Sequence, residues 1–127
     1  MDNADLLKQG RNLILQLHKM LVDFEREGYE MINGRTTSGQ FLNVLLEDPG
    51  FAWLKEFSNL IVVVDEMFAQ KDGLDGSAID AELARMRDLV VMKDVPEDFP
   101  GKYQYALQES SEIAGKHAEL KSLLAQN

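Results

Sequence analysis

The segment LEDPGFAWLKEF, residues 46–57, constrains the fold more than any other part of the chain. It places the only tryptophan, Trp53, directly after an Asp-Pro-Gly sequence and before a run of aliphatic residues. A residue before proline is pushed out of the helical region, so a preceding helix must end by Asp48. Asp48 is suited to cap a new helix, and Pro49 fits its first position, where a missing N–H has no consequence. The segment therefore predicts a corner between two helices, with Trp53 filling the space between them.

Apolar residues recur at helical spacing on both sides of this corner. Residues 3 to about 32 form one long amphipathic pattern, which we expect to end at Asn33-Gly34. A capping box at residues 37–40 opens a short second helix, and the third helix, which carries Trp53, is apolar over more than half of its circumference. Ser77 and Asp80 mark the start of a fourth helix, and Pro100 lies in the first turn of a last one, with apolar residues along one face up to Leu124. Side chains expected on the inner faces include Leu6, Leu7, Leu13, Leu17, Leu21, Met31, Trp53, Phe57, Ile61, Phe68, Leu83, Met86 and Tyr103.

These patterns predict an all-α protein. We expect a helical bundle of about five helices, with a long N-terminal helix, a short second helix and a central third helix that carries Trp53. A chain of 127 residues is most simply one domain, so residues 1–127 are assigned to a single helical domain. Gly10, Gly28 and the small residues at 110–115 are expected where helices cross closely or bend, because glycine otherwise lowers helix stability by about 1 kcal/mol relative to alanine.

Charge and composition exclude several classes of function. The net charge is −9, from 13 basic and 22 acidic residues, and this surface would repel a phosphate backbone, so we expect no nucleic-acid binding. The longest apolar run, residues 60–64, is far shorter than the ~20 residues that span a bilayer, so we expect no membrane insertion. With no cysteine there is no disulfide or thiol site, and the acidic N-terminal residues do not resemble a secretory signal. A cytoplasmic protein is the expectation.

The two histidines provide the one candidate constellation for chemistry. His18 borders the apolar stripe of the first helix, His117 falls in line with the stripe of the last, and Asp65 is the carboxylate in line with the apolar residues of the third. If the first and last helices are neighbours, these three side chains form a polar cluster that could bind zinc or iron. The alternative is that each histidine is a hydrogen-bonded core residue. Di-iron chemistry is disfavoured, because neither histidine follows a glutamate by three residues.

The first helix also carries an acidic face, formed by Asp23, Glu27 and Glu30 with Arg26 between them. Carboxylates perform acid–base chemistry only when burial separates their pKa values, so a solvated face is the simpler interpretation. The same face has the charge to meet a basic partner, and a protein that mimics nucleic acid is one form of that alternative.

A set of short motifs runs through residues 17–66: Leu-His-Lys at 17–19, Phe-Glu-Arg at 24–26, Tyr-Glu at 29–30, Ser-x-Leu-Ile-Val-x-x-Asp-Glu at 58–66, and above all Phe-Leu-x-x-Leu-Leu-x-Asp-Pro-x-Phe-Ala-Trp-Leu at 41–54. In these motifs the chain resembles a family of small uncharacterised bacterial helical proteins. The resemblance implies a bacterial source and a helical fold, and it supplies no catalytic residues.

Together these features predict a protein that acts through a protein partner or by forming a homo-oligomer. The apolar stripes are complete, whereas no nucleophile elbow, phosphate loop or cofactor motif is present, so we expect no cofactor and a role that is not enzymatic. The alternative is a metal- or small-ligand-binding protein, or an enzyme, that uses His18, Asp65 and His117.

Overall fold

The computed structural model describes residues 1–126, and these residues form helices and no strand, which confirms the predicted all-α class. The elements in chain order are α1 (Asn3–Asn33), α2 (Ser38–Glu47), the 3-10 helix η1 (Pro49–Leu54), α3 (Lys55–Ala69), α4 (Gly76–Val90), α5 (Phe99–Glu109) and α6 (Ser111–Leu124).

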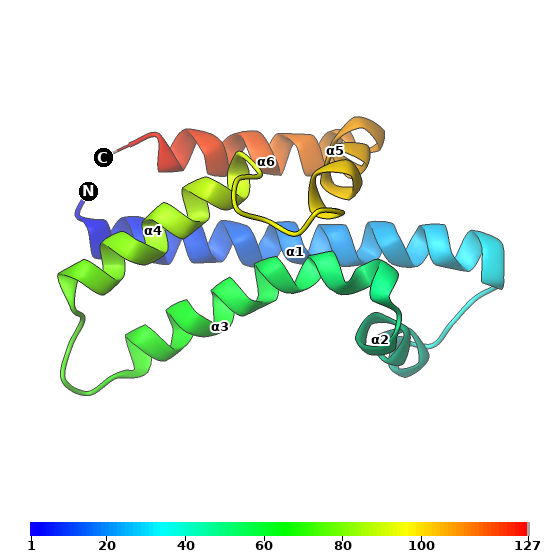
Figure 1. The fold of residues 1–127 in the computed structure, drawn as a ribbon, viewed down its shortest axis with the longest axis horizontal. Coiled ribbons are helices and arrows are strands. Elements are labelled where there is room, and N and C mark those ends of the chain that lie inside the picture. Colours follow the sequence, from blue (N-terminus) through cyan, green and yellow to red (C-terminus); the bar gives the residue numbers. More distant parts are fainter. Residues whose placement is uncertain (127) are drawn as a thin grey trace.

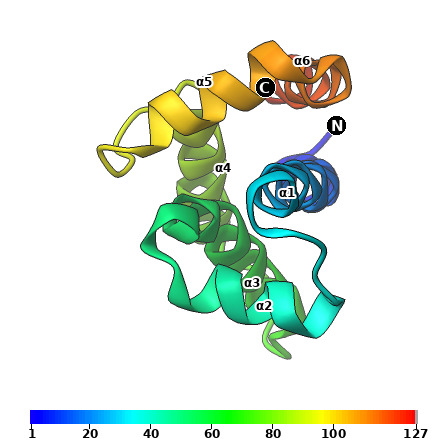
Figure 2. The same ribbon diagram turned by 90° about the vertical axis from the view of Figure 1, so that its right-hand side faces the viewer.

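The long helix α1 is the axis on which the others are arranged (Figure 1). It packs against α3, α4 and α6, and both α3 and α6 run antiparallel to it. Viewed along α1, the pair α5–α6 lies on one side and α2–α3 on the other, with α4 between them (Figure 2). The two chain ends lie together at one end of the molecule, whereas the last turns of α1 extend past α3 and α6 at the other (Figure 1).

The corner before Trp53 forms as the sequence predicts. The side chain of Asp48 accepts a hydrogen bond from the Gly50 amide at 2.8 Å, and Pro49 occupies the first turn of the following segment. That segment is the 3-10 helix η1, which continues directly into α3 at Lys55, so the expected third helix begins with a tighter turn. Trp53 is fully buried, with 1% of its surface exposed.

Trp53 belongs to an aromatic core that joins segments distant in sequence. Its ring centroid lies 5.5 Å from that of Phe99, and 6.2 Å from those of Phe57 and Tyr103. Phe99 and Tyr103 belong to α5, so these contacts hold α5 against η1 and α3. The pairs with Phe57 and Phe99 are edge-to-face, and such pairs contribute about 0.5–1.5 kcal/mol beyond the burial of their area.

Two helix boundaries differ from the prediction. The expected last helix is two helices, because Ser110 adopts an extended conformation (φ −130°, ψ 112°) and its hydroxyl caps α6 by accepting from the Ile113 amide at 3.2 Å. The bundle therefore has six α-helices among the described residues. The fourth helix begins at Gly76, capped by Asp75 rather than by Ser77 and Asp80, because the Asp75 carboxylate reaches the Ser77 amide at 3.0 Å.

Two residues expected in the core lie at the surface. Met31 is 84% exposed and Phe68 is 37% exposed. Met31 lies in the last turns of α1, which extend past α3 and α6, and Phe68 lies in the last turn of α3, where that helix diverges from α1 (Figure 1). The apolar spacing is correct at both positions, but packing is incomplete there. The predicted stop at Gly34 is confirmed, since its φ is +88°, and so is the capping box between Thr37 and Gln40.

The glycines divide into one close crossing and several open positions. A Cβ on Gly10 would lie 2.7 Å from the sulfur of Met86, so α1 and α4 cross closely there. A Cβ on Gly28 or Gly115 would meet nothing within 4 Å. A close crossing is therefore present at Gly10 and absent at Gly28 and Gly115.

Candidate functional site

Asp65, one of the three predicted site residues, is held by an arginine of α1. Arg11 donates two hydrogen bonds to its carboxylate, from Nε to Oδ1 at 2.8 Å and from Nη2 to Oδ2 at 2.9 Å. These bonds lower the pKa of Asp65 and raise that of Arg11. The side chain of Asp65 is half-exposed, so this bidentate pair fixes the register of α1 against α3 at the surface rather than in the core.

His117 is paired with a buried tyrosine. Its Nδ1 lies 2.7 Å from the hydroxyl of Tyr103. Burial, with a smaller effect of Lys121, lowers the pKa of His117, and burial raises the pKa of Tyr103. Both shifts favour the neutral forms, so the phenol donates to the neutral imidazole.

His18 is partly buried on α1, and burial lowers its pKa. The three predicted residues do not meet as a metal site: within the described part of the chain, no group of three or more histidine and carboxylate side chains could hold a metal ion. Asp65 pairs with Arg11 and His117 pairs with Tyr103. Both pairings result from how the helices pack, which the spacing of residues along each helix does not predict.

The structure instead presents a groove between the C-terminal part of α1 and α5. It encloses about 630 Å³ and is the most spacious of the hollows described in this molecule. We call it the α1–α5 groove. Its lining residues are Phe24, Glu25, Glu27, Gly28, Tyr29, Met31, Ile32, Asn33, Phe51, Tyr105, Glu109 and Ser110.

Aromatic rings form much of the groove wall. Phe24 of α1 meets Tyr105 of α5 edge-on, with ring centroids 5.9 Å apart, and Tyr29 of α1 meets Phe51 of η1 at 6.3 Å. Tyr29 and Phe51 also contact Phe41 of α2, at 5.8 Å each. Three separate elements therefore fix the positions of these rings around the last two turns of α1.

A hydrogen-bonded loop keeps this end of α1 in place. Both the amide and the hydroxyl of Thr36 donate to Glu30 Oε2, at 2.6 and 2.8 Å, and Arg26 donates to the Thr36 carbonyl at 2.6 Å. The Thr36 donors lower the pKa of Glu30. Glu30 and Arg26, which the sequence placed on a solvated acidic face, thus anchor the loop between α1 and α2 beside the groove.

Glu25 is the groove residue that sequence reasoning missed. It is partly buried, and loss of hydration raises its pKa. Lys102 opposes this shift from a distance, but its ammonium group donates to the Gly50 carbonyl and lies 3.7 Å from Asp98. No ion pair to Glu25 exists among residues 1–126. The available signal was its register, since Glu25 follows the buried Leu21 by four residues on the same helix face.

The buried indole of Trp53 lies next to this carboxylate. Among the described residues, its Nε1–H has no hydrogen-bond acceptor, and its nearness to Glu25 partly offsets the increase that burial causes in the pKa of that group. Glu25 therefore connects the groove to the aromatic core.

A smaller hollow of about 180 Å³ adjoins the groove and shares Phe24, Glu27 and Ser110 with it. Its remaining lining residues are Met20, Asp23, Glu112 and Ile113. The two hollows together are lined by five carboxylates, those of Asp23, Glu25, Glu27, Glu109 and Glu112, and by no lysine or arginine. The two hollows therefore combine apolar walls with charged side chains that are all negative.

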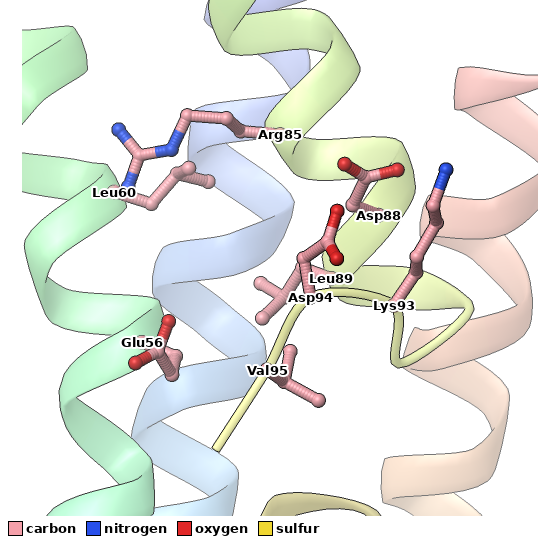
Figure 3. A pocket seen from close by; sticks show the side chains of 8 residues that line it. All are labelled: Glu56, Leu60, Arg85, Asp88, Leu89, Lys93, Asp94 and Val95. Atoms are coloured by element: carbon pink, nitrogen blue, oxygen red, sulfur yellow. The ribbon is translucent and has the colours of Figure 1, made fainter.

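A second candidate lies between α3, α4 and the following loop (Figure 3). This hollow of about 270 Å³ has mixed charges, with Arg85 and Lys93 opposite three carboxylates. Arg85 is already bonded to Glu82, at 3.1 and 3.2 Å. The lining residues are Glu56, Leu60, Arg85, Asp88, Leu89, Lys93, Asp94 and Val95. Because charges of both signs line this hollow, its charge favours neither cationic nor anionic ligands.

The loop at this second hollow contains two non-glycine residues with positive φ, Met92 at 60° and Asp94 at 56°. The first is explained by the end of α4. The Lys93 amide donates to the Asp88 carbonyl at 2.8 Å and the Met92 amide to the Leu89 carbonyl at 3.1 Å, which is the pattern that ends a helix with one left-handed residue. Strain at Met92 thus terminates a helix, and it does not indicate a site.

Comparison of the chain with protein-family models, curated proteins and solved structures finds no match. The family resemblance of residues 17–66 stays a prediction. Among residues 1–126, no helix combines the length and apolar character needed to cross a lipid bilayer. The geometry of the α1–α5 groove is therefore the basis for an inference about function.

Proposed function

We propose that this protein is a binding module, which holds a segment of a partner protein in the α1–α5 groove. The observation that carries the proposal is the exposure of large apolar side chains at the groove edge. Met31 is 84% exposed, Ile32 is 86% exposed and Tyr105 is 57% exposed. Contiguous apolar surface in a concave site is typical of protein-interaction surfaces.

Large apolar side chains are also exposed on α2, at the same end of the molecule. Leu42 and Leu46 are 54% and 63% exposed. The groove itself is prearranged by the aromatic contacts of Tyr29 and Phe51, so binding would require little ordering of the protein. A helical segment with an apolar stripe is the partner that such a groove accommodates.

The acidic rim favours a different protein over a second copy of this chain. Each copy has a net charge of −9, and a symmetric dimer through this face would bring the same carboxylates against each other. Self-association is the competing use of the surface. We place the interaction in the bacterial cytoplasm, which the lack of cysteine and the resemblance of residues 17–66 support.

Gly28 provides a direct test. It lines the groove, is exposed, and has no atom within 4 Å of an added Cβ, so Gly28→Phe should fill the groove without disturbing the core. Gly115→Phe is the matched control, because Gly115 is equally open on α6 and lines none of the hollows described above.

Peptides selected from a random library on the wild-type protein should bind it, lose binding to Gly28→Phe and keep binding to Gly115→Phe. Equal binding to both variants would refute the groove as the site. Light scattering of the wild-type protein decides the competing use: a dimer that Gly28→Phe dissociates would assign the groove to self-association instead.

A further inference from the structure

We infer that the partner segment presents a lysine or arginine side chain to the groove, where Glu25 and the rings of Phe24 and Tyr105 receive the cation. This inference rests on the proposed function and deepens it, since it names the chemistry that selects the partner. It concerns a cation carried by a polypeptide, and a free organic cation is treated below as a competing outcome.

The first argument is the unbalanced charge of the site. Three carboxylates line the groove, and two more line the hollow that adjoins it, without a lysine or arginine in either wall. A site of one sign with apolar walls concentrates the field and attracts ligands of opposite charge. Charge complementarity of this kind determines which partner binds and how fast it associates.

The second argument is the state of Glu25. Its carboxylate is partly removed from water, and no ion pair to it exists within residues 1–126. Lys102, the cation that acts on it, is occupied by the Gly50 carbonyl and by Asp98. A partly desolvated carboxylate without a countercharge is unfavourable, and a cation from the partner would remove that cost.

The third argument is the arrangement of aromatic rings beside the carboxylates. Phe24 and Tyr105 form an edge-to-face pair with centroids 5.9 Å apart, and both line the groove with Glu25. A lysine or arginine side chain matches such a wall, because its methylene groups pack on the rings while the charged end meets π faces and carboxylates. Such a contact exists within residues 1–126, where the guanidinium carbon of Arg26 lies 5.9 Å from the Phe41 ring centroid.

The test uses the full-length protein and three helical peptides of about four turns. The peptides share one apolar stripe without tryptophan, and their flanking positions are lysine, glutamine or glutamate. Binding is followed by the emission of Trp53, the only tryptophan, and by amide chemical shifts of groove residues. We expect the lysine peptide to bind about tenfold more tightly than the glutamine peptide, and the glutamate peptide to bind most weakly. Added salt should reduce these differences.

Two matched variants locate the effect. Glu25→Gln, Glu27→Gln and Glu109→Gln combined should abolish the preference for lysine. The control combines Glu47→Gln, Glu66→Gln and Glu97→Gln, three exposed carboxylates outside the groove that change the net charge equally, and it should keep the preference. The peptide series on the wild-type protein does not depend on the folding of either variant.

The outcomes separate the two proposals. If the three peptides bind the groove equally, the protein-binding function stands and the cation inference fails. If none of them shifts groove resonances, both fail at this site. Spermidine that binds as tightly as the lysine peptide would overturn the assignment to a polypeptide.

Discussion

Gly10 and Gly28 lie on the same helix, α1, and the structure predicts opposite effects for the same substitution at these two positions. The exposed Gly28 has no neighbour within 4 Å of an added Cβ, so Gly28→Ala should recover the helix propensity that glycine lacks, about 1 kcal/mol. At Gly10 the added Cβ would lie 2.7 Å from the Met86 sulfur and 3.8 Å from Leu124 Cδ2.

The contact at Gly10 determines the magnitude of the loss. Carbon atoms in favourable contact are about 3.5–4.0 Å apart, so Met86 would have to move by about 1 Å. Met86 is fully buried, at 0% exposure, so a turn of its side chain must be taken up by its core neighbours. Overpacking of this kind costs about 1–3 kcal/mol, and the middle of that range, about 2 kcal/mol, is larger than the gain of about 1 kcal/mol in helix propensity. Gly10→Ala should therefore destabilise the protein by about 1 kcal/mol.

Urea unfolding, followed by circular dichroism and by Trp53 emission, measures both variants against the wild type. The free energies of unfolding should differ by about 2 kcal/mol between the variants, or by about 8 °C in Tm for a chain of this size. The slope of the urea dependence should stay constant, which shows that both variants unfold from equally compact states. Equal stabilisation by the two substitutions would refute the close crossing of α1 and α4.

Three further predictions concern the aromatic core and the histidines. Trp53→Ala should cost about 3–5 kcal/mol in urea unfolding, because it empties a fully buried aromatic site, and a loss below about 1 kcal/mol would contradict that packing. Burial lowers the pKa of His18 and of His117, so the unfolded chain binds more protons than the folded protein below about pH 6.5. The free energy of unfolding should therefore fall as the pH decreases from 7 through 6, and replacing both histidines with glutamine should flatten this dependence. An unchanged dependence in that variant would contradict the role of the histidines. Tyr103→Phe should lower the free energy of unfolding by about 1 kcal/mol and raise the pKa of His117 relative to the wild type, because the neutral imidazole loses its hydrogen-bond donor. Proton NMR titration of the His117 ring measures this pKa, and an unchanged value would contradict the importance of the pair.

Short-range signals predicted the elements well, and they were less reliable at helix ends. The caps of Thr37 and Asp48 and the burial of Trp53 follow from residues within a few positions of each other. The break at Ser110 escaped the same reasoning, because the apolar spacing continues across it while the serine hydroxyl offers a cap. Met31 satisfied the spacing of a core residue and is exposed, because α1 extends past α3 and α6 there and the groove beside Met31 is open.

The candidate site was predicted less well than the helices. The sequence proposed His18, Asp65 and His117 from their positions on separate helix faces, but it contained no information on which faces would meet. Asp65 pairs with Arg11, 54 residues away, and His117 with Tyr103, and neither pairing leaves a trace in periodicity. The sequence shows that Glu25 shares a helix face with Leu21, whereas it does not show that Tyr105 of α5 lies beside that part of α1.

The sequence by itself determined the helical class, the corner at Asp48, the burial of the indole and the acidic charge, because capping, periodicity and composition act over a few residues. Tertiary structure alone decided that α1 is the axis, that its last turns remain uncovered, and that α5 lies across from them to form the groove. The physical reason is that burial depends on which neighbour covers a face, and that choice is made by the packing of side chains from the whole chain at once.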